Sequence, residues 1–222
     1  MTWFARGQND RLVVTVRDRG RVIGLPIING GESQHMNTPY YPIPFSPGML
    51  QGVADGVFPQ LLPRLTLADG AQLAPLAYAA HVKVAGKGAR TVVTYDQDRL
   101  DRLGQKAPVA DDRFSVRTTY VLEPGRIRRT DVFTPKAGVT VKAVDLAFAS
   151  FSTKAVTRGG QTRFGAGEVT GFDVQGLTCA TRPLDDKKAY RSPTGAMTAL
   201  TSCTGGAPAG GPITVSWTLT YR

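Results

Sequence analysis

The clearest structural signal in the sequence is the run ITVSWTLTY, from Ile213 to Tyr221. Large apolar side chains alternate in it with serine and threonine at every position. Successive side chains of a β-strand point to opposite faces of the sheet, so strict alternation indicates a strand with one buried face. This run therefore predicts a strand whose second face is polar and exposed to water.

The same alternation recurs from Phe114 to Leu122. The residues that follow, Glu123-Pro124-Gly125-Arg126, predict a turn, because proline fixes one backbone dihedral and glycine tolerates a positive φ. The segment from Arg126 to Phe133 is then the partner strand of a hairpin. A further strand is expected from Val139 to Phe148.

A second hairpin is expected near the N-terminus. Its strands are Arg11 to Arg17 and Arg21 to Ile28, and the short connection between them contains Gly20. Helical patterns are scarce: Gln97 to Leu103 is long enough for a turn or two, and the apolar stretch Met49 to Leu62 is broken by glycine and proline. The sequence predicts an all-β fold, a large antiparallel two-sheet β-sandwich of supersandwich-like form with few or no helices.

Length and composition agree with one such domain spanning residues 1–222. A chain of 222 residues can bury a substantial core, and its 25 glycines and 15 prolines suit tight turns between short strands. No apolar run approaches the roughly 20 residues that span a bilayer, so we expect no membrane partner. Met1 to Asp10 is polar and lacks a hydrophobic signal region, so for an exported protein the signal either has been removed or lies on a longer precursor.

The chain is strongly basic. It has 27 lysines and arginines against 17 aspartates and glutamates, a formal net charge of +10. Such an excess attracts polyanions. Helix-turn-helix, zinc-finger and aromatic RNP patterns are missing from the sequence, so nucleic acid is the less favoured partner and acidic polysaccharide the more favoured one. The densest basic cluster is Arg126, Arg128 and Arg129.

Cys179 and Cys203 are the two cysteines. A disulfide between them is favoured over two buried free thiols, and their spacing is unlike that of a zinc site. We expect no metal and no cofactor. A secreted or periplasmic location is expected.

One segment, Asn29 to Gly48, interrupts the strand pattern with four prolines, three glycines and one of the two histidines. Long loops in compact domains often carry function, and prolines hold such a loop rigid at modest entropic cost. The alternative is a loop clamped to the sandwich by aromatic packing. The other histidine, His81, lies in the strand-like stretch Leu76 to Val84 and is expected to be structural.

The loop has the residue types that β-elimination on a uronate needs: a base, an acid for the leaving oxygen, and a group that neutralises the carboxylate. The expected catalytic residues are His35, Tyr40 and Tyr41. The expected substrate-binding residues are Asn29, Gln34, Asn37, Phe45 and Arg64, in which amides and guanidinium hydrogen-bond the carboxylate and the aromatic ring supports a sugar. With only three glutamates, the chain shows no spacing typical of a two-carboxylate glycosidase.

The stretch Phe114 to Pro135, FSVRTTYVLEPGRIRRTDVFTP, resembles a strand-turn-strand run in the β-sandwich portions of heparinase II/III-like polysaccharide lyases and related carbohydrate-active enzymes. The loop from His35 to Gly48 also resembles these enzymes. The resemblance implies a preceding α/α-toroid domain, with the active site in a cleft between toroid and sandwich. The sequence contains no such helical domain, so it is either the C-terminal sandwich portion of a larger enzyme or a free-standing relative.

These observations predict a β-sandwich domain of a polysaccharide-degrading enzyme, a lyase acting on uronate-containing glycan. Its partners would be the acidic polysaccharide and a missing toroid domain or second chain. Two alternatives stay open: a non-catalytic carbohydrate-binding or interdomain module, and a structural assembly protein whose strand edges mediate contacts.

Overall fold

The computed structural model describes residues 2–8, 11–18, 21–28, 44–45, 61–76, 78–87, 89–105, 109–184, 191–192, 195–208 and 210–222. All regular structure in these ranges is β, and no helix occurs in them, which confirms the predicted fold class. The described part of the chain accordingly contains no helix with the length and apolar character needed to cross a membrane.

The largest sheet has eight antiparallel strands in the order β14-β15-β16-β21-β12-β11-β8-β7. Their bounds are β7 Ala79–Lys87, β8 Arg90–Gln97, β11 Phe114–Glu123, β12 Arg126–Pro135, β14 Thr153–Arg158, β15 Gln161–Ala166, β16 Val169–Gln175 and β21 Ile213–Tyr221. The alternating run ITVSWTLTY is β21, in the interior of this sheet.

The second large sheet has seven strands in the order β10-β9-β6-β5-β13-β20-β17. Their bounds are β5 Arg64–Leu67, β6 Gln72–Ala74, β9 Leu100–Arg102, β10 Ala110–Asp111, β13 Val141–Ser150, β17 Thr178–Pro183 and β20 Ala199–Gly205. A four-stranded sheet contains β1 Thr2–Gln8, β2 Arg11–Asp18, β3 Arg21–Ile28 and β4 Pro44–Phe45, and a two-stranded one contains β18 Arg191–Ser192 and β19 Gly195–Ala196.

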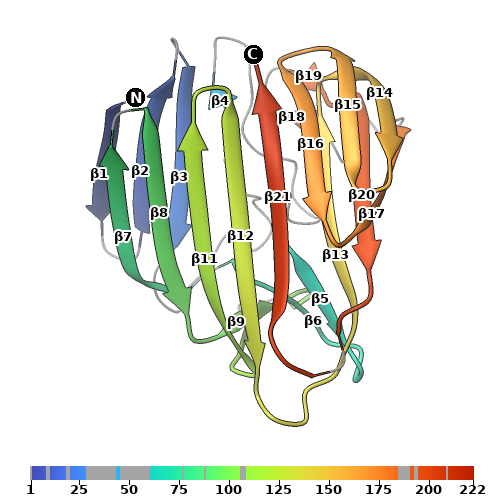
Figure 1. Ribbon diagram of the computed structural model, residues 1–222. Coiled ribbons are helices and arrows are strands. Elements are labelled where there is room, and N and C mark those ends of the chain that lie inside the picture. The colour runs from blue at the N-terminus through green and yellow to red at the C-terminus, as the bar shows by residue number, and fades with distance from the viewer. Residues whose placement is uncertain are drawn as a thin grey trace.

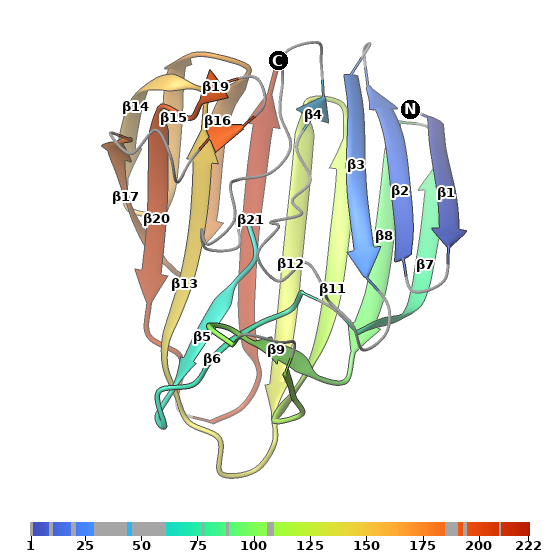
Figure 2. The same cartoon turned by 180° about the vertical axis from the view of Figure 1, so that it is seen from behind.

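The eight-stranded sheet forms one layer of a sandwich (Figure 1). The seven-stranded and four-stranded sheets lie side by side in the other layer, as the view from behind shows (Figure 2). Apolar side chains of both layers share one core, in which Leu25 and Ile27 of β3 belong to the same cluster as Trp217 and Leu219 of β21. The exposed fraction of Trp217 is 1%, and the other apolar side chains of β21 are buried as well: Leu219 and Tyr221 lie in this core, and Ile213 and Val215 in a second apolar cluster.

The predicted hairpin is confirmed as β11–β12, whose register pairs Glu123 with Arg126 across a two-residue turn. Gly125 in that turn has φ +73°, a left-handed conformation that explains the glycine. The turn is tied to the opposite layer, because Asp18 at the end of β2 accepts hydrogen bonds from the Gly125 N–H and the Tyr221 hydroxyl, both at 2.8 Å. A buried carboxylate thus joins the two layers.

The stretch Gln97 to Leu103, long enough for a helical turn or two, is not helical. Gln97 ends β8, and Leu100–Arg102 forms β9, which pairs with β6 and β10. Leu100 is buried in the second apolar cluster between the layers, separate from the one that contains Trp217. The reason is tertiary: the short segment hydrogen-bonds to two neighbouring strands, which a local pattern does not reveal.

Alternation along β12 divides the basic cluster. Arg126 and Arg128 are exposed, whereas Arg129 is buried with an exposed fraction of 1%. Its guanidinium donates two hydrogen bonds of 2.7 Å to the buried Asp131 and one of 2.5 Å to the hydroxyl of Tyr120. Burial lowers the pKa of Arg129, but the charge of Asp131 outweighs that effect and holds the pKa well above its usual value. Arg129 is therefore a core cation, unavailable to ligands.

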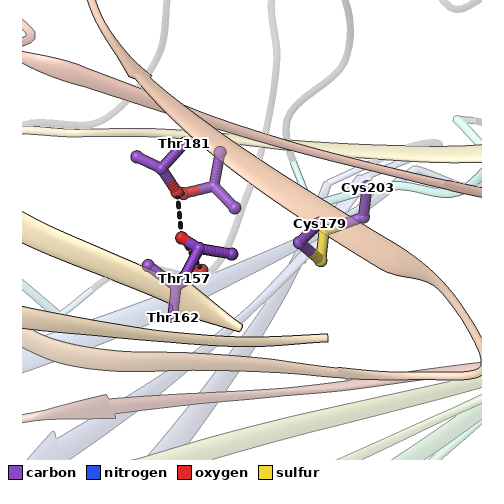
Figure 3. The surroundings of a disulfide bond; sticks show 6 residues. Thr157, Thr162, Cys179, Thr181 and Cys203 are labelled. Atoms are coloured by element: carbon purple, nitrogen blue, oxygen red, sulfur yellow. Dashed lines mark hydrogen bonds between the residues drawn. A yellow bond between two sulfur atoms is a disulfide. The ribbon is translucent and has the colours of Figure 1, made fainter. Parts of the chain in front are cut away.

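Side chains stabilise one side of the sandwich, both within a sheet and between the layers. Cys179 and Cys203, a registered pair of the neighbouring strands β17 and β20, form a disulfide within the seven-stranded sheet. The Thr181 hydroxyl is 2.6 Å from that of Thr157 in β14, which in turn lies 3.0 Å from that of Thr162 in β15 (Figure 3). These hydroxyl contacts connect the edge strand of one large sheet with the edge of the other.

Candidate functional site

A groove of about 780 Å³ lies where β7 and β11 begin and where β8 and β12 end, at the lower end of the sheet in Figure 1. It is on the solvent side of the sheet, because its β11 lining includes the exposed Ser115 and Arg117. The other chemically useful side chains that line it are Tyr78, His81, Asp96, Asp98 and Arg99. We call this the bulge groove.

A β-bulge builds one wall of the bulge groove. Ala80 pairs with Asp96 and Lys83 with Thr94, so one residue more lies on β7 than on β8 over this interval. His81 sits in the bulge with φ +53°, a sparsely populated conformation for a residue with a side chain. Bulges of this kind re-aim side chains. The imidazole of His81 is 78% exposed, so a ligand in the groove can reach it.

Asp96 lies between two potential cations. Its carboxylate oxygens are 3.9 Å from Nδ1 of His81 and 3.9 Å from Nε of Arg117. Both separations exceed hydrogen-bonding distance, so neither side chain is locked by the carboxylate. Arg117 is 66% exposed and keeps donors for an incoming anion.

Tyr78 also lines the groove and has φ +67°, so it is the second strained residue within four positions. The guanidinium carbon of Arg99 lies 5.5 Å from the centroid of its ring, and Arg99 is held by two hydrogen bonds of 2.8 and 2.7 Å to Asp98. Burial, followed by the charge of Asp101, raises the pKa of Tyr78. The phenol therefore stays protonated at neutral pH and can act as a proton donor.

Two sparsely populated backbone conformations at one groove are informative. Such conformations cost about 1–3 kcal/mol each and cluster at functional sites. Here they position the phenol of Tyr78 and the imidazole of His81 at the same groove. The arrangement combines a proton donor, an imidazole and an accessible guanidinium, which is the set of groups that β-elimination beside a carboxylate requires.

Most of the residues predicted as the site lie outside the described residues. These are Asn29, Gln34, His35, Asn37, Tyr40 and Tyr41. Phe45 is described only through its backbone, as part of β4, which pairs with β3. Arg64 lies on β5 and forms a hydrogen bond of 3.2 Å and an ion-pair contact of 3.0 Å with Asp145.

Arg64 and Asp145 line a second, smaller cavity of about 260 Å³ on the seven-stranded sheet. The structure therefore places Arg64 on a different sheet from the bulge groove, with its guanidinium engaged by a carboxylate. The described residues contain no cluster of three or more metal-ligating side chains.

The bulge groove lies outside the site that the sequence predicts. His81 was expected to be structural, whereas the structure shows an exposed imidazole in the groove lining. The bulge has no local signal, because apolar residues stand at every second position from Ala80 to Val84 and only the strand pairing reveals the extra residue. The convergence of Tyr78, His81 and Arg117 depends on strand pairing and has no local signature.

The sequence matches no known protein-family profile, and none of the curated proteins matches it. Its fold is similar to that of the heparan sulfate lyase HepC from Pedobacter heparinus and of a mutant of that enzyme, each with a TM-score of 0.61 and 9% identity. The similarity covers all of this chain and 37% of the lyase chain. A third structure, of HI1317, has a TM-score of 0.43 and 9% identity over the whole of both chains. The chain thus shares a β-sandwich fold with about a third of a longer lyase.

Proposed function

We propose that this chain is the β-sandwich domain of a polysaccharide-degrading enzyme, a lyase that cleaves uronate-containing glycan by β-elimination. The observation that carries the proposal is the bulge groove, where Tyr78, His81 and Arg117 line one accessible surface. The fold likeness to HepC and the net charge of +10 support it, since acidic glycans are polyanions.

Each side chain has one role in the proposed reaction. Arg117 hydrogen-bonds the uronate carboxylate and stabilises negative charge that develops on the adjacent carbon. His81, in its neutral form, accepts the proton of that carbon. The electron pair of the broken C–H bond forms the carbon–carbon double bond, the glycosidic C–O bond breaks, and Tyr78 protonates the leaving oxygen. Proton return from His81 to Tyr78 through water restores the site.

The proposal extends to partners and location. The resemblance to heparinase II/III-like lyases supports a toroid domain or second chain that completes the cleft, as does a match to 37% of the HepC chain. A disulfide supports an oxidising compartment, secreted or periplasmic. The segment Asn29 to Gly48 is proposed to contribute further side chains, with His35 and Tyr40 as its reactive ones.

A second candidate is a non-catalytic glycan-binding or interdomain module. The observation in its favour is the engagement of Arg99 by Asp98, since a cation held over the Tyr78 ring suits static binding. In this case substitutions at His81 or Arg117 weaken glycan binding, and there is no turnover to lose.

The test is absorbance of the unsaturated uronate product after the protein at its full natural length is mixed with alginate, heparin or polygalacturonate. We expect product, and we expect His81→Gln and Tyr78→Phe to lower kcat by about 100-fold or more. Arg158→Ala, an exposed change on the opposite edge strand β14, is the matched control. Absence of product from every polymer refutes the lyase. If neither His81→Gln nor Tyr78→Phe lowers the rate of product formation, the reaction does not take place in the bulge groove.

A further inference from the structure

The solvent side of the eight-stranded sheet carries a second set of cations beyond the bulge groove. Arg90 of β8 and Arg126 and Arg128 of β12 all face outward. They lie near the β11–β12 turn, at the opposite end of these strands from the groove. We call them the hairpin arginines.

Positive charge is in excess at the hairpin arginines. Arg90 and Arg126 share a single carboxylate, Glu123, each at 3.6 Å. Arg128 has the neutral residues Val121 and Thr218 as its registered neighbours on the adjoining strands. No ion pair of Arg128 is found within the part of the chain that the structure describes. One carboxylate therefore compensates three guanidinium groups, and Arg128 is open to an external anion.

Between the bulge groove and the hairpin arginines the surface is rich in hydroxyls. Thr119 and Thr130 form a registered pair there, and Thr94 continues the same row on β8. Ser216, next in the row on β21, is buried, and its hydroxyl lies 3.0 Å from that of Thr130. Outward positions of β8, β11, β12 and β21 contain no aromatic side chain. Hydroxyls hydrogen-bond sugars, whereas single-stranded nucleic acid is usually bound by stacking on aromatic rings.

The two cationic regions are aligned along the strands. Arg117 of the groove pairs with Val132, and Arg128 lies four residues from Val132 on the same strand. At roughly 3.3 Å per residue the separation along the strand is about 13 Å, and Arg126 lies about 20 Å from the groove. This distance suits an extended oligosaccharide longer than a disaccharide.

We propose that the solvent side of β8, β11, β12 and β21 is a binding track for an extended anionic glycan, running from the bulge groove to the hairpin arginines. The inference rests on the proposed function for the class of ligand, and it adds contacts with sugars far from the bond that is cleaved. The guanidinium groups of Arg126 and Arg128 bind carboxylate or sulfate groups of the chain, and the threonine row binds its hydroxyls.

The test compares ligand lengths. Dissociation constants for heparin, alginate and polygalacturonate, each as a disaccharide and as a long oligomer, are measured in a His81→Gln background, in which cleavage is expected to be slow. The double substitution Arg126→Ala/Arg128→Ala is expected to weaken long-oligomer binding about tenfold and to leave disaccharide binding unchanged. The control is Lys142→Ala/Arg182→Ala, which removes the same charge from exposed positions of the seven-stranded sheet.

Three results would overturn the track. The first is equal weakening of long-oligomer binding by both double variants, which would show an effect of net charge alone. The second is no weakening by Arg126→Ala/Arg128→Ala, and the third is tighter binding of single-stranded DNA of matched length that this double substitution also weakens. Disaccharide binding by Arg117→Ala tests the groove separately. If Arg117→Ala loses disaccharide binding while Arg126→Ala/Arg128→Ala has no effect, the groove is supported and the track is refuted. If Arg126→Ala/Arg128→Ala weakens long-oligomer binding but no polymer yields product, the track is supported and the lyase activity is refuted.

Discussion

Replacing Asp131 by asparagine is expected to lower the free energy of unfolding by about 3–5 kcal/mol. Asp131 is fully buried and accepts three hydrogen bonds of 2.7 Å, two from Arg129 and one from the Thr118 hydroxyl. Asparagine keeps the size of the side chain but removes its charge. The guanidinium of Arg129, 1% exposed, would then remain in the core without a counter-charge.

The size of this effect depends on burial, and two further variants isolate that dependence. Arg129→Met/Asp131→Leu removes both charges together with the cost of desolvating them, so it is expected to lose less stability than Asp131→Asn alone. Asp173→Asn breaks an ion pair with Arg163, whose side chain is 54% exposed, and is expected to cost at most about 1 kcal/mol.

Urea unfolding followed by tryptophan fluorescence measures these differences, since Trp217 is buried beside Tyr120 with ring centroids 6.3 Å apart. The midpoint should fall while the slope stays constant. The reasoning is refuted by a loss below about 1 kcal/mol in Asp131→Asn, or by a double variant less stable than that single variant.

Further predictions concern stability. Cys179→Ala/Cys203→Ala should lower the free energy of unfolding by about 3 kcal/mol, because the disulfide spans 24 residues, and reductant should lower the wild-type urea midpoint equally. Hydrogen bonds from Arg113 hold the pKa of Asp111 below its usual value, so its stabilising contribution is complete above about pH 4 and fades as pH falls through the folded-state pKa. The difference in the free energy of unfolding between wild type and Asp111→Asn, measured by urea titration, should therefore become smaller as the pH is lowered. A difference that stays constant from pH 2 to 7 contradicts this. Gly125→Ala, at φ +73°, should cost about 1–2 kcal/mol in thermal unfolding, whereas no change would argue against the left-handed turn.

Strands with one buried face were predictable from the sequence. Ile213–Tyr221 is β21 to the residue, and the β11–β12 hairpin follows its predicted turn, because alternation and turn chemistry are local properties. The short β9 was not predictable, since its strand conformation depends on pairing with two distant segments.

The bulge groove was not predictable because its side chains come from four strands and from the connections next to β7 and β8, and their positions depend on strand register. The segment Asn29 to Gly48, with its prolines, tyrosines and histidine, is the stronger local signal in the sequence. A high local density of reactive residues identifies one segment of the chain, whereas a groove forms where side chains from several distant segments come together. Arg129 shows the same limitation in another form: it looks like part of a surface cluster, and only the inward partner Asp131, two residues along, indicates a core position.

The bulge at His81 has a consequence for how the protein behaves at high concentration. β7 is the edge strand of the eight-stranded sheet, and a regular edge is a template for pairing with a strand of another molecule. An extra residue with a left-handed backbone interrupts the spacing of N–H and C=O groups along that edge. Deleting one residue to restore regular pairing would therefore both close the groove and expose a continuous edge to aggregation. The irregularity that exposes the imidazole of His81 is thus also one of the devices by which an edge strand disfavours pairing with another molecule.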